Sequence, residues 1–391
     1  MIAVIADDFT GAAEIGGIAL RHGYNAVFTT NLETRYDTDV LIIATDTRSE
    51  PPEKAREIIR ELTLQLLELG PELIYKKIDS VLRGNVGEEL MEQMEVSSKK
   101  RALIIPPNPS LNRIIKDGIY YYEGAPLNSS NFSMESAIKN NSSKVLDLIG
   151  EKSAHYTTII SNGDSLPAEG LIIGNTVDET DLTHWAEKLD NETLMAGGSS
   201  FFNAILRKIR LHPIADPEQS LVVGKNRIYV CGSAFPFSRR VVAASFNNGR
   251  FVAYMPSDMF CESANMETLL MAWEDKIIKG ICETGQVIIA IDDLKCPGSA
   301  NLATDISKVI ATVVERVMLR IKVEELIIEG GATASSIIKK LKYKKFYPVQ
   351  ELAVGVIRMK VEENKDLFIT MKPGSYHWPA SIWNYNKSIE I

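Results

Sequence analysis

The sequence predicts two α/β domains, of which the N-terminal one is built on a doubly wound, mostly parallel sheet. The chain has 391 residues, which is too long for one ordinary hydrophobic core. Its first hundred residues alternate short apolar runs with helical patterns, and this alternation is typical of βαβ units. Residues 211–226 carry two prolines and several charges, so we expect the domains to comprise residues 1–215 and 216–391.

Apolar runs mark the expected strands of the N-terminal domain, at residues 2–6, 25–29, 40–44, 73–78 and 102–105. Helical patterns occupy residues 11–20, 51–69 and 87–94. The second of these begins with Pro51-Pro52, because proline is tolerated in the first turn of a helix. We expect a loop-rich segment at 108–150, with one short hairpin that pairs 119–122 with 125–126, and a return to α/β patterning at 155–206.

The C-terminal domain repeats the same alternation of short strands and helices. We expect strands at residues 227–230, 287–291 and 326–328, and helices at 239–246 and 306–321. The last of these strands runs directly into Glu329-Gly330-Gly331-Ala332-Thr333. No internal repeat or low-complexity tract interrupts the pattern.

Composition excludes several classes of protein. The net charge is −8, so the basic footprint of a nucleic-acid binder is missing. No run of about 18 apolar residues exists, so we expect no membrane span. Without a visible secretion signal we expect a cytoplasmic protein, and we expect its four cysteines, which show no CxxC spacing, to be reduced. Small molecules are therefore the expected partners, while self-association stays open.

Polar residues follow the expected strands of the N-terminal domain. In open parallel sheets, ligands bind at the carboxyl ends of the strands, so these residues mark a candidate ligand edge. They are Asp7, Asp8, Asp46, Arg48, Asp79 and Ser80.

The segment Ala6-Asp7-Asp8-Phe9-Thr10-Gly11-Ala12 is the strongest local signal. Two adjacent carboxylates at a strand end can bind a cation, accept hydrogen bonds from substrate hydroxyls or take up a proton, and their mutual repulsion should raise the pKa of one. Thr10 and Gly11 open a helix whose free N–H groups favour an anion. The alternative is that Asp8 or Thr10 only caps this helix and that Asp7 is a solvated turn residue.

A second signal runs from Lys76 to Asn85 and places lysine and arginine beside a strand-end aspartate. Lys77 and Arg83 suit a carboxylate, and Asp79 suits hydroxyl groups, so the segment fits a ligand that carries both. The two cations should also lower the pKa of Asp79. The alternative is a surface ion-pair cluster, and Arg48 has the same two interpretations.

Glycines follow two strands of the C-terminal domain, in Cys231-Gly232-Ser233-Ala234 and in Gly330-Gly331-Ala332-Thr333. Glycine lets the backbone approach phosphate closely, and the helix that follows supplies N–H donors. The alternative is an ordinary turn at a helix start. No GxxxxGK[ST] motif and no protein-kinase signature set occur, and the histidines lack ligand spacing, so we assign no metal site.

These motifs together resemble the four-carbon acid sugar kinases, which phosphorylate threonate, erythronate, 3-oxo-tetronate and similar acids. The similarity covers almost the whole chain in the family's order. It comprises ADDFTGA at 6–12, Asp46-Thr47-Arg48-Ser49, KKIDSVLRGNVGEEL from Lys76, the segment 106–127, Ala196-Gly197-Gly198-Ser199, Gly232-Ser233, Gly330 to Thr333, and Lys372-Pro373-Gly374. The chain departs from the family at Ala234-Phe235, at Ser375-Tyr376-His377, and at Asn112-Arg113, where the family has Gly-Arg.

The resemblance implies an ATP-dependent kinase whose active site lies between the two domains. It implies that the acid is bound by Asp8, Arg48, Lys77, Ile78, Asp79 and Ser80, to which the residue pattern adds Arg83. It implies that ATP is bound by Ser233, Gly330, Gly331, Ala332, Thr333 and Gly374. We expect Asp8 to be the catalytic base or to orient the reacting hydroxyl, with Asp7 as the other candidate, and Mg²⁺ to arrive on the nucleotide.

Three other functions fit part of the pattern. An aspartyl phosphatase or mutase needs DxD, which Asp8-Phe9-Thr10 lacks. A signalling receiver domain needs a lysine where this chain has Pro106-Pro107. A ligand-binding regulatory protein on an inactive kinase scaffold is the remaining alternative, and ATP turnover separates it from a kinase.

Overall fold

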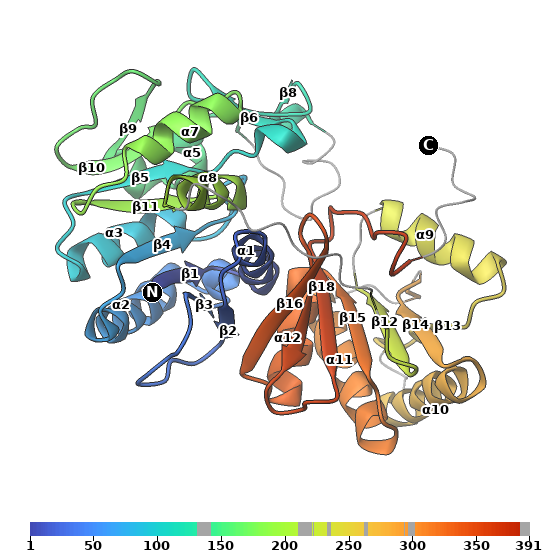
Figure 1. Cartoon of the computed structure of the whole chain (residues 1–391). Helices are drawn as coiled ribbons and strands as arrows, with labels where there is room; N and C mark the ends of the chain where they lie inside the picture. The colour runs from blue at the N-terminus through green and yellow to red at the C-terminus, as the bar shows by residue number, and fades with distance from the viewer. Residues whose placement is uncertain are drawn as a thin grey trace. The chain divides into compact units, whose positions relative to one another are not determined.

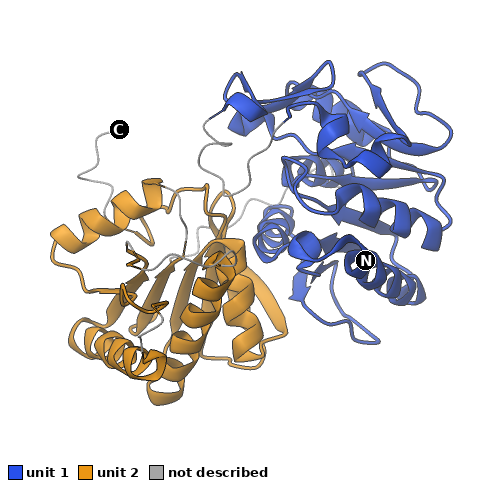
Figure 2. Cartoon of the chain, turned by 180° about the vertical axis from the view of Figure 1, so that it is seen from behind, with its two compact units in different colours: residues 1–216 blue, residues 217–391 orange. Residues whose placement is uncertain are grey.

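The computed structural model describes residues 1–130, 142–209, 221, 223–232, 236–261, 265–292, 294–295 and 302–383. The chain forms two compact units, residues 1–216 and residues 217–391, which are coloured separately in Figure 2. Each unit has its own α/β architecture around a largely parallel sheet, as the sequence predicts.

Unit 1 contains a sheet of eight strands in its described part, all of them parallel to their neighbours. The spatial order is β2-β3-β1-β4-β11-β5-β10-β9. Their bounds are β1 Ile2–Ala6, β2 Ala26–Thr29, β3 Val40–Ala44, β4 Leu73–Lys77, β5 Arg101–Ile105, β9 Thr157–Ile160, β10 Gly170–Gly174 and β11 Thr193–Gly197. The central strands are buried on both faces, which explains why they appear in the sequence as continuous apolar runs.

Helices cover both faces of this sheet (Figure 1), so the sheet is doubly wound. The longer ones are α1 Phe9–Arg21, α2 Pro52–Leu69, α3 Val86–Val96, α7 Glu179–Glu187 and α8 Ser199–Ile209. Helix α8 packs against α1 and α7, whereas α2 packs against α3. Helix α2 begins at Pro52 and ends at Gly70, which adopts the left-handed conformation that favours glycine. The short helix α6 Glu151–Ala154 packs against α3 and against the preceding short helix α5 Val145–Leu148.

A small antiparallel sheet, β6 Arg113–Lys116, β7 Ile119–Tyr122 and β8 Ala125–Pro126, packs onto the core of unit 1. The predicted pairing of 119–122 with 125–126 is confirmed. Strand β6 is missing from the sequence prediction. It pairs with β7 across a tight turn at Asp117-Gly118, both with positive φ, and Asp-Gly between two apolar runs is a recognised hairpin signal that could have revealed it.

Unit 2 contains a sheet of seven described strands in the order β13-β14-β12-β15-β18-β17-β16. The first five run parallel, and β17 and β16 add an antiparallel edge. The bounds are β12 Arg227–Cys231, β13 Val252–Tyr254, β14 Gln286–Ala290, β15 Glu325–Glu329, β16 Lys345–Ala353, β17 Val356–Val361 and β18 Phe368–Lys372. The sequence prediction missed the short β13, the parallel strand β18 and the whole antiparallel edge.

Four helices of unit 2 flank this sheet: α9 Pro236–Asn247, α10 Met266–Thr284, α11 Leu302–Arg320 and α12 Gly331–Leu341. Helix α11 packs against both α10 and α12 (Figure 1). Residues of α9 share a second core with Trp378, Ile382 and Trp383 from the C-terminal segment.

Two expectations about the whole chain can be compared with the described residues. None of the described helices combines the length and the apolar character needed to cross a membrane. Cys231 and Cys282 carry free thiols, but Cys261 is disulfide-bonded, so the prediction that the cysteines are reduced was wrong for that residue.

Candidate functional site

Three adjacent strands of unit 1 bring the predicted acid-binding residues together. Strands β3, β1 and β4 are neighbours, and their carboxyl ends lie at one edge of the sheet. Asp7 and Asp8 follow β1, Arg48 lies in the short 3₁₀ helix η1 (Thr47–Ser49) after β3, and Lys77 ends β4. Residues separated by up to seventy positions in the chain therefore meet because parallel strands present their carboxyl ends to the same side.

Arg48 lies at the centre of this cluster. Its Nε and Nη2 donate to the two carboxylate oxygens of Asp7 at 2.9 and 2.8 Å, which is the planar, two-bond contact that guanidinium favours. Nη2 also donates to Asp8 Oδ1 at 2.9 Å, and Nη1 lies 3.5 Å from Asp79 Oδ1. One arginine thus holds three carboxylates at the end of the sheet.

The loop after β4 fixes the backbone around Arg48. Gly84 has φ +89, and a Cβ added there would lie 3.0 Å from Arg48 Cγ and 3.1 Å from Arg48 O, so only glycine fits this close approach. The side-chain amide of Asn85 donates to the carbonyl oxygens of Thr47 and Glu50 at 3.1 and 2.8 Å. The motif that contains Gly84 and Asn85 was recognised in the sequence, but this role was not predicted for either residue.

Asp8 caps helix α1. Its Oδ1 accepts from the Gly11 N–H at 3.0 Å, and its Oδ2 accepts from Thr10 Oγ1 at 2.6 Å. Burial raises the pKa of Asp8, but the charges of Arg48 and Lys77 and the hydrogen bond from Thr10 outweigh that effect and hold the pKa below its ordinary value. The increase expected from repulsion between the two aspartates is therefore not found at Asp8.

Asp79 forms a compact ion pair with Arg83. Arg83 Nε and Nη2 donate to Asp79 Oδ2 and Oδ1 at 2.8 and 2.6 Å, and the N–H groups of Val81 and Arg83 donate to Oδ2. Burial raises the pKa of Asp79, yet Arg83 and Arg48 together hold it far below its ordinary value. The predicted lowering is confirmed, although the second cation responsible is Arg48.

Lys77 and Ile78 are both buried at the end of β4. Lys77 Nζ donates to the carbonyl oxygen of Ile78 at 2.9 Å, and a Cβ added at Gly11 would lie 3.0 Å from that Nζ. The Ile78 side chain is buried in the core of unit 1, and its N–H donates to the Gly197 carbonyl. Ile78 is thus principally a packing residue in this arrangement.

Ser80 is joined to a residue that the sequence prediction did not assign to the site. Arg113, the first residue of β6, donates from Nη1 to Ser80 Oγ at 2.9 Å. The Arg113 guanidinium also lies 5.4 Å from the centre of the Tyr122 ring. The hairpin therefore carries a further cation to the ligand edge.

In unit 2, the glycine-containing segments converge at the ends of adjacent strands. Strands β12, β15 and β18 are neighbours. Gly232 follows β12 and lies against Thr333, because a Cβ added at Gly232 would be 2.2 Å from Thr333 Oγ1. The Gly330 N–H donates to the Lys372 carbonyl at 3.0 Å, which joins the turn after β15 to the end of β18. Gly374 lies in the loop that follows β18. Ser233, which was predicted to bind ATP, lies outside the described residues.

The turn at Gly330 has the properties that a phosphate requires. Gly330 adopts φ 95 and ψ 136, a conformation almost restricted to glycine, and no atom of the described residues beyond its chain neighbours lies within 4 Å of the position that its Cβ would occupy. Gly331, Ala332 and Thr333 form the first turn of α12, where backbone N–H groups have no partner within the helix. An anion at this helix start would accept those hydrogen bonds.

A buried carboxylate, Glu329, directly precedes this turn at the end of β15. Glu329 accepts from Ser238 Oγ, from Trp378 Nε1 at 3.2 Å and from Lys372 Nζ at 3.3 Å. Burial lowers the pKa of Lys372, and the Glu329 charge only partly counteracts this. Glu329 thus connects α9, β18 and the C-terminal segment behind the glycine turn.

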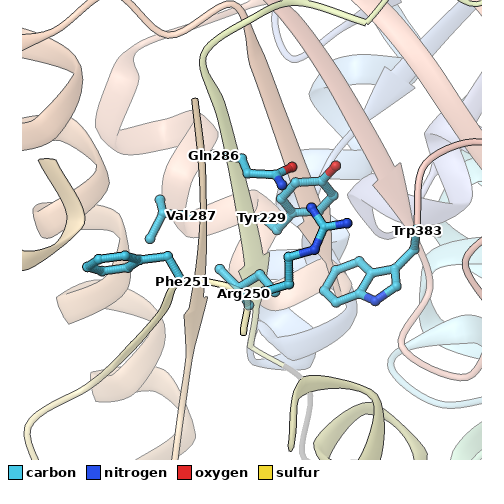
Figure 3. Close-up of a pocket in the computed structure, with 7 residues that line it drawn as sticks. Tyr229, Arg250, Phe251, Gln286, Val287 and Trp383 are labelled. Atoms are coloured by element: carbon cyan, nitrogen blue, oxygen red, sulfur yellow. The ribbon is translucent and has the colours of Figure 1, made fainter. Parts of the chain in front are cut away.

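A pocket elsewhere in unit 2 contains none of the predicted site residues (Figure 3). Arg250 and Trp383 lie beside the Tyr229 ring in this view, and Gln286 and Val287 come from the start of β14. The glycine turn follows the end of β15, and β14 and β15 both run parallel to β12, so the pocket lies toward the opposite ends of the strands. Among the described residues, no group of three or more His, Cys, Asp or Glu side chains is arranged to hold a metal ion.

Two family models match the chain, one for each unit. Residues 2–205 match a sugar-binding N-terminal domain, and residues 228–376 match a nucleotide-binding C-terminal domain. The acid-binding candidates lie in the first match, and the ATP-binding candidates lie in the second.

Proteins of similar sequence are named as kinases of four-carbon acids. A D-threonate kinase of Salmonella typhimurium is 25% identical over 85% of this chain and 85% of its own length. A D-erythronate kinase of Heliobacterium modesticaldum is 30% identical over 41% of this chain and 38% of its own length. A 3-oxo-tetronate kinase of Haemophilus influenzae is 23% identical over 96% of this chain and 97% of its own length.

Solved structures share the fold. A crystal structure from Salmonella typhimurium LT2 matches with a TM-score of 0.78 at 17% identity, over 99% of this chain and 98% of that chain. At this level of identity the likeness concerns the fold alone.

Proposed function

We propose that this chain, which belongs to the four-carbon acid sugar kinase family, transfers the γ-phosphoryl group of ATP to a hydroxyl of a four-carbon sugar acid such as threonate, erythronate or 3-oxo-tetronate. The observation that carries the proposal is the cluster at the ends of β3, β1 and β4. Carboxylates and cations alternate there within hydrogen-bond distance of one another. Such an edge can accept hydrogen bonds from several hydroxyl groups and donate to an acid group, which a polyhydroxy acid needs.

The proposed nucleotide site is the glycine turn of unit 2. No described residue beyond its chain neighbours fills the place that a side chain at Gly330 would take, and the first turn of α12 offers backbone N–H groups. These donors suit phosphate oxygens because the helix dipole adds a partial positive charge at the same place. Gly374 and Lys372 belong to the neighbouring loop and strand end, and we assign them to the same proposed site.

Asp8 is the residue that we propose to orient the reacting hydroxyl. Its side chain is 11% exposed, whereas the side chains of Asp7 and Asp79 are each 5% exposed. Asp7 and Asp79 are each held by two bonds from one arginine, whereas Asp8 accepts only one bond from an arginine and its other two from Thr10 and Gly11 of its own helix. Its lowered pKa favours alignment of the hydroxyl over early removal of the proton, and phosphoryl transfer depends mainly on such positioning and on charge stabilisation.

Magnesium is expected as part of the nucleotide substrate, because charge on the β- and γ-phosphates is neutralised by a divalent ion in phosphoryl transfer. The described residues contain no protein-only cage for it. MgATP is therefore the form that we expect to bind, and removal of Mg²⁺ by excess EDTA should stop turnover.

The test is ADP release by the purified full chain with MgATP and each four-carbon acid in turn, with the phosphorylated product identified by mass spectrometry. We expect one acid to raise ADP release well above the rate without acid. Tight binding of an acid and of ATP without any turnover would instead indicate a regulatory protein on a kinase scaffold. Absence of both binding and turnover would refute the proposed function.

A further inference from the structure

A buried ion pair joins the ends of the two strands that border the glycine turn. Glu329 is the last residue of β15 and Lys372 is the last residue of β18, and the register of these parallel strands pairs the two residues directly. Their side chains are each 2% exposed, and Lys372 Nζ lies 3.3 Å from Glu329 Oε2. Because Gly330 follows Glu329 and its N–H donates to the Lys372 carbonyl at 3.0 Å, the pair is joined to the backbone of the turn through both residues.

The ammonium group of Lys372 is engaged on three sides by the protein itself. Besides its contact with Glu329, Nζ donates to the Pro373 carbonyl at 3.2 Å and lies 5.0 Å from the centre of the Trp378 ring, within the range of a cation–π contact. An ammonium has three N–H donors, so these partners leave little capacity for a phosphate oxygen. A lysine that binds phosphate as a point charge has to present its ammonium to the ligand.

Glu329 is held by other parts of unit 2 as well. It accepts from Ser238 Oγ of α9 and from Trp378 Nε1 at 3.2 Å, so it connects α9 and the C-terminal segment to the end of β18. On its other side, β15 pairs Glu329 with Cys231. Burial and the Glu329 charge raise the pKa of the Cys231 thiol well above its ordinary value, so the thiol is neutral near pH 7 and Lys372 is the counter-charge of this carboxylate.

We propose that Glu329 and Lys372 are positioning residues of the nucleotide site, and that the phosphates of ATP are bound by the backbone of the turn and not by the Lys372 ammonium. This inference deepens the proposed function and rests on it. The pair keeps two buried charges neutralised and holds the loop Lys372-Pro373-Gly374 against Gly330 at the start of α12. Removal of one charge leaves the other unpaired in a buried place, which is far more costly than replacement of both by neutral side chains of similar size.

The test is a double-mutant cycle in the full chain, followed by calorimetric binding of MgATP. Glu329→Gln and Lys372→Met should each weaken MgATP binding about 10- to 100-fold, because the unpaired partner displaces the loop and a charge-assisted hydrogen bond to phosphate is lost with it. The double variant should bind MgATP more tightly than either single variant, because it leaves no unpaired charge. Such a rescue is impossible if the Lys372 ammonium itself binds phosphate.

The acid provides a second readout, since the pair belongs to unit 2 and the acid-binding candidates belong to unit 1. The Michaelis constant for the acid is measured by ADP release at saturating MgATP. It should stay close to that of wild type in both single variants, while the Michaelis constant for ATP rises. A change of the same size in both constants would contradict a role confined to the nucleotide site.

Glu325→Gln is the matched control. Glu325 begins β15, so it lies at the opposite end of the same strand from the glycine turn, and it too is a buried carboxylate that pairs with a cation, Arg358. Its replacement should lower stability in urea denaturation, as Glu329→Gln does, but leave MgATP binding unchanged. If Glu325→Gln weakens MgATP binding as much as Glu329→Gln, the effect comes from general destabilisation of unit 2, and the inference is overturned.

The possible results separate this inference from the proposed function. If wild type binds MgATP and the double variant binds it as weakly as Lys372→Met, the ammonium contacts the nucleotide and the inference alone is overturned. Unchanged MgATP binding in both single variants also overturns it. If a single variant does not fold, as judged by thermal unfolding, the double variant decides alone: binding within about tenfold of wild type supports the inference, and weaker binding overturns it. A wild-type protein that does not bind MgATP refutes the proposed nucleotide site, and this inference with it.

Discussion

Replacement of Gly330 by alanine should weaken ATP binding without affecting the acid. Gly330 adopts φ 95 and ψ 136, and a non-glycine residue in this region costs on the order of 1–3 kcal/mol. The added Cβ would meet no atom of the described residues within 4 Å, so we expect no contribution from a clash with that part of the chain. It would instead occupy space that we assign to phosphate, and loss of one charge-assisted hydrogen bond corresponds to about a 10- to 100-fold increase in the Michaelis constant for ATP.

Gly150 offers a control with the same backbone conformation. It precedes helix α6 with φ 95 and ψ 142, and the nearest atom to its added Cβ is Glu88 Oε1 at 3.6 Å, which is an ordinary contact. Gly150→Ala should therefore introduce similar backbone strain in the other unit. Any effect of strain alone on the assay should appear in both variants, and an effect on phosphate binding should appear only in Gly330→Ala.

The assay is steady-state ADP release with ATP varied at saturating acid, then with acid varied at saturating ATP. Urea denaturation of both variants shows whether the loss of stability is comparable. The reasoning is refuted if Gly330→Ala has the same Michaelis constant for ATP as wild type. It is also refuted if Gly150→Ala raises that constant as much as Gly330→Ala does.

Three further substitutions test the cluster in unit 1. Asp8→Asn should lower the turnover rate by about 10²–10⁴ with little change in acid binding, and a rate within a few-fold of wild type would move the role to another aspartate. Arg48→Lys should lower kcat/KM for the acid about tenfold or more, because lysine cannot bind Asp7 through two bonds; unchanged kinetics would contradict this. Asp79→Asn should cost about 3–5 kcal/mol of unfolding free energy near neutral pH. The folded-state pKa of Asp79 lies below its unfolded value of 3.8, so this contribution to stability exists above about pH 4 and is lost as the pH falls further. Urea denaturation should therefore show the unfolding free energies of wild type and Asp79→Asn converging in acid. A difference that stays constant with pH would contradict this role of Asp79.

The strands of unit 1 and the polar residues at their ends could be predicted from local sequence. Each strand from β1 to β5 was predicted within one or two residues, because a strand buried on both faces is an unbroken apolar run. The sequence therefore predicts that the polar residues following those runs lie at one edge of the sheet. Asp7, Asp8, Arg48 and Asp79 do lie together there, but the pairing of Arg48 with Asp7 could not be foreseen, since it depends on the 3₁₀ turn after β3 and on the close approach of Gly84.

Other elements were missed for identifiable physical reasons. Strands β16 and β17 pair antiparallel at an edge of the sheet, with irregular register and partial exposure, so their sequences show no continuous apolar run. Glu329 and Lys372 were not recognised as a pair, because the hydrogen bonds that make a buried charge tolerable come from Ser238 and Trp378, which are distant in the chain.

The sequence by itself determined the two α/β units, the edge of each sheet that carries polar or glycine-rich segments, and the family to which the chain belongs. These properties are local, because they follow from apolar periodicity and from residue types at fixed offsets from a strand end. Only the tertiary structure decided which charges neutralise one another. Arg48 and Arg83 donate hydrogen bonds to the protein's own aspartates, and Arg113 contacts Ser80 because a hairpin packs against the core of unit 1. Coulombic interactions depend on the distance between charges in space, and the separation of two residues along the chain does not determine that distance.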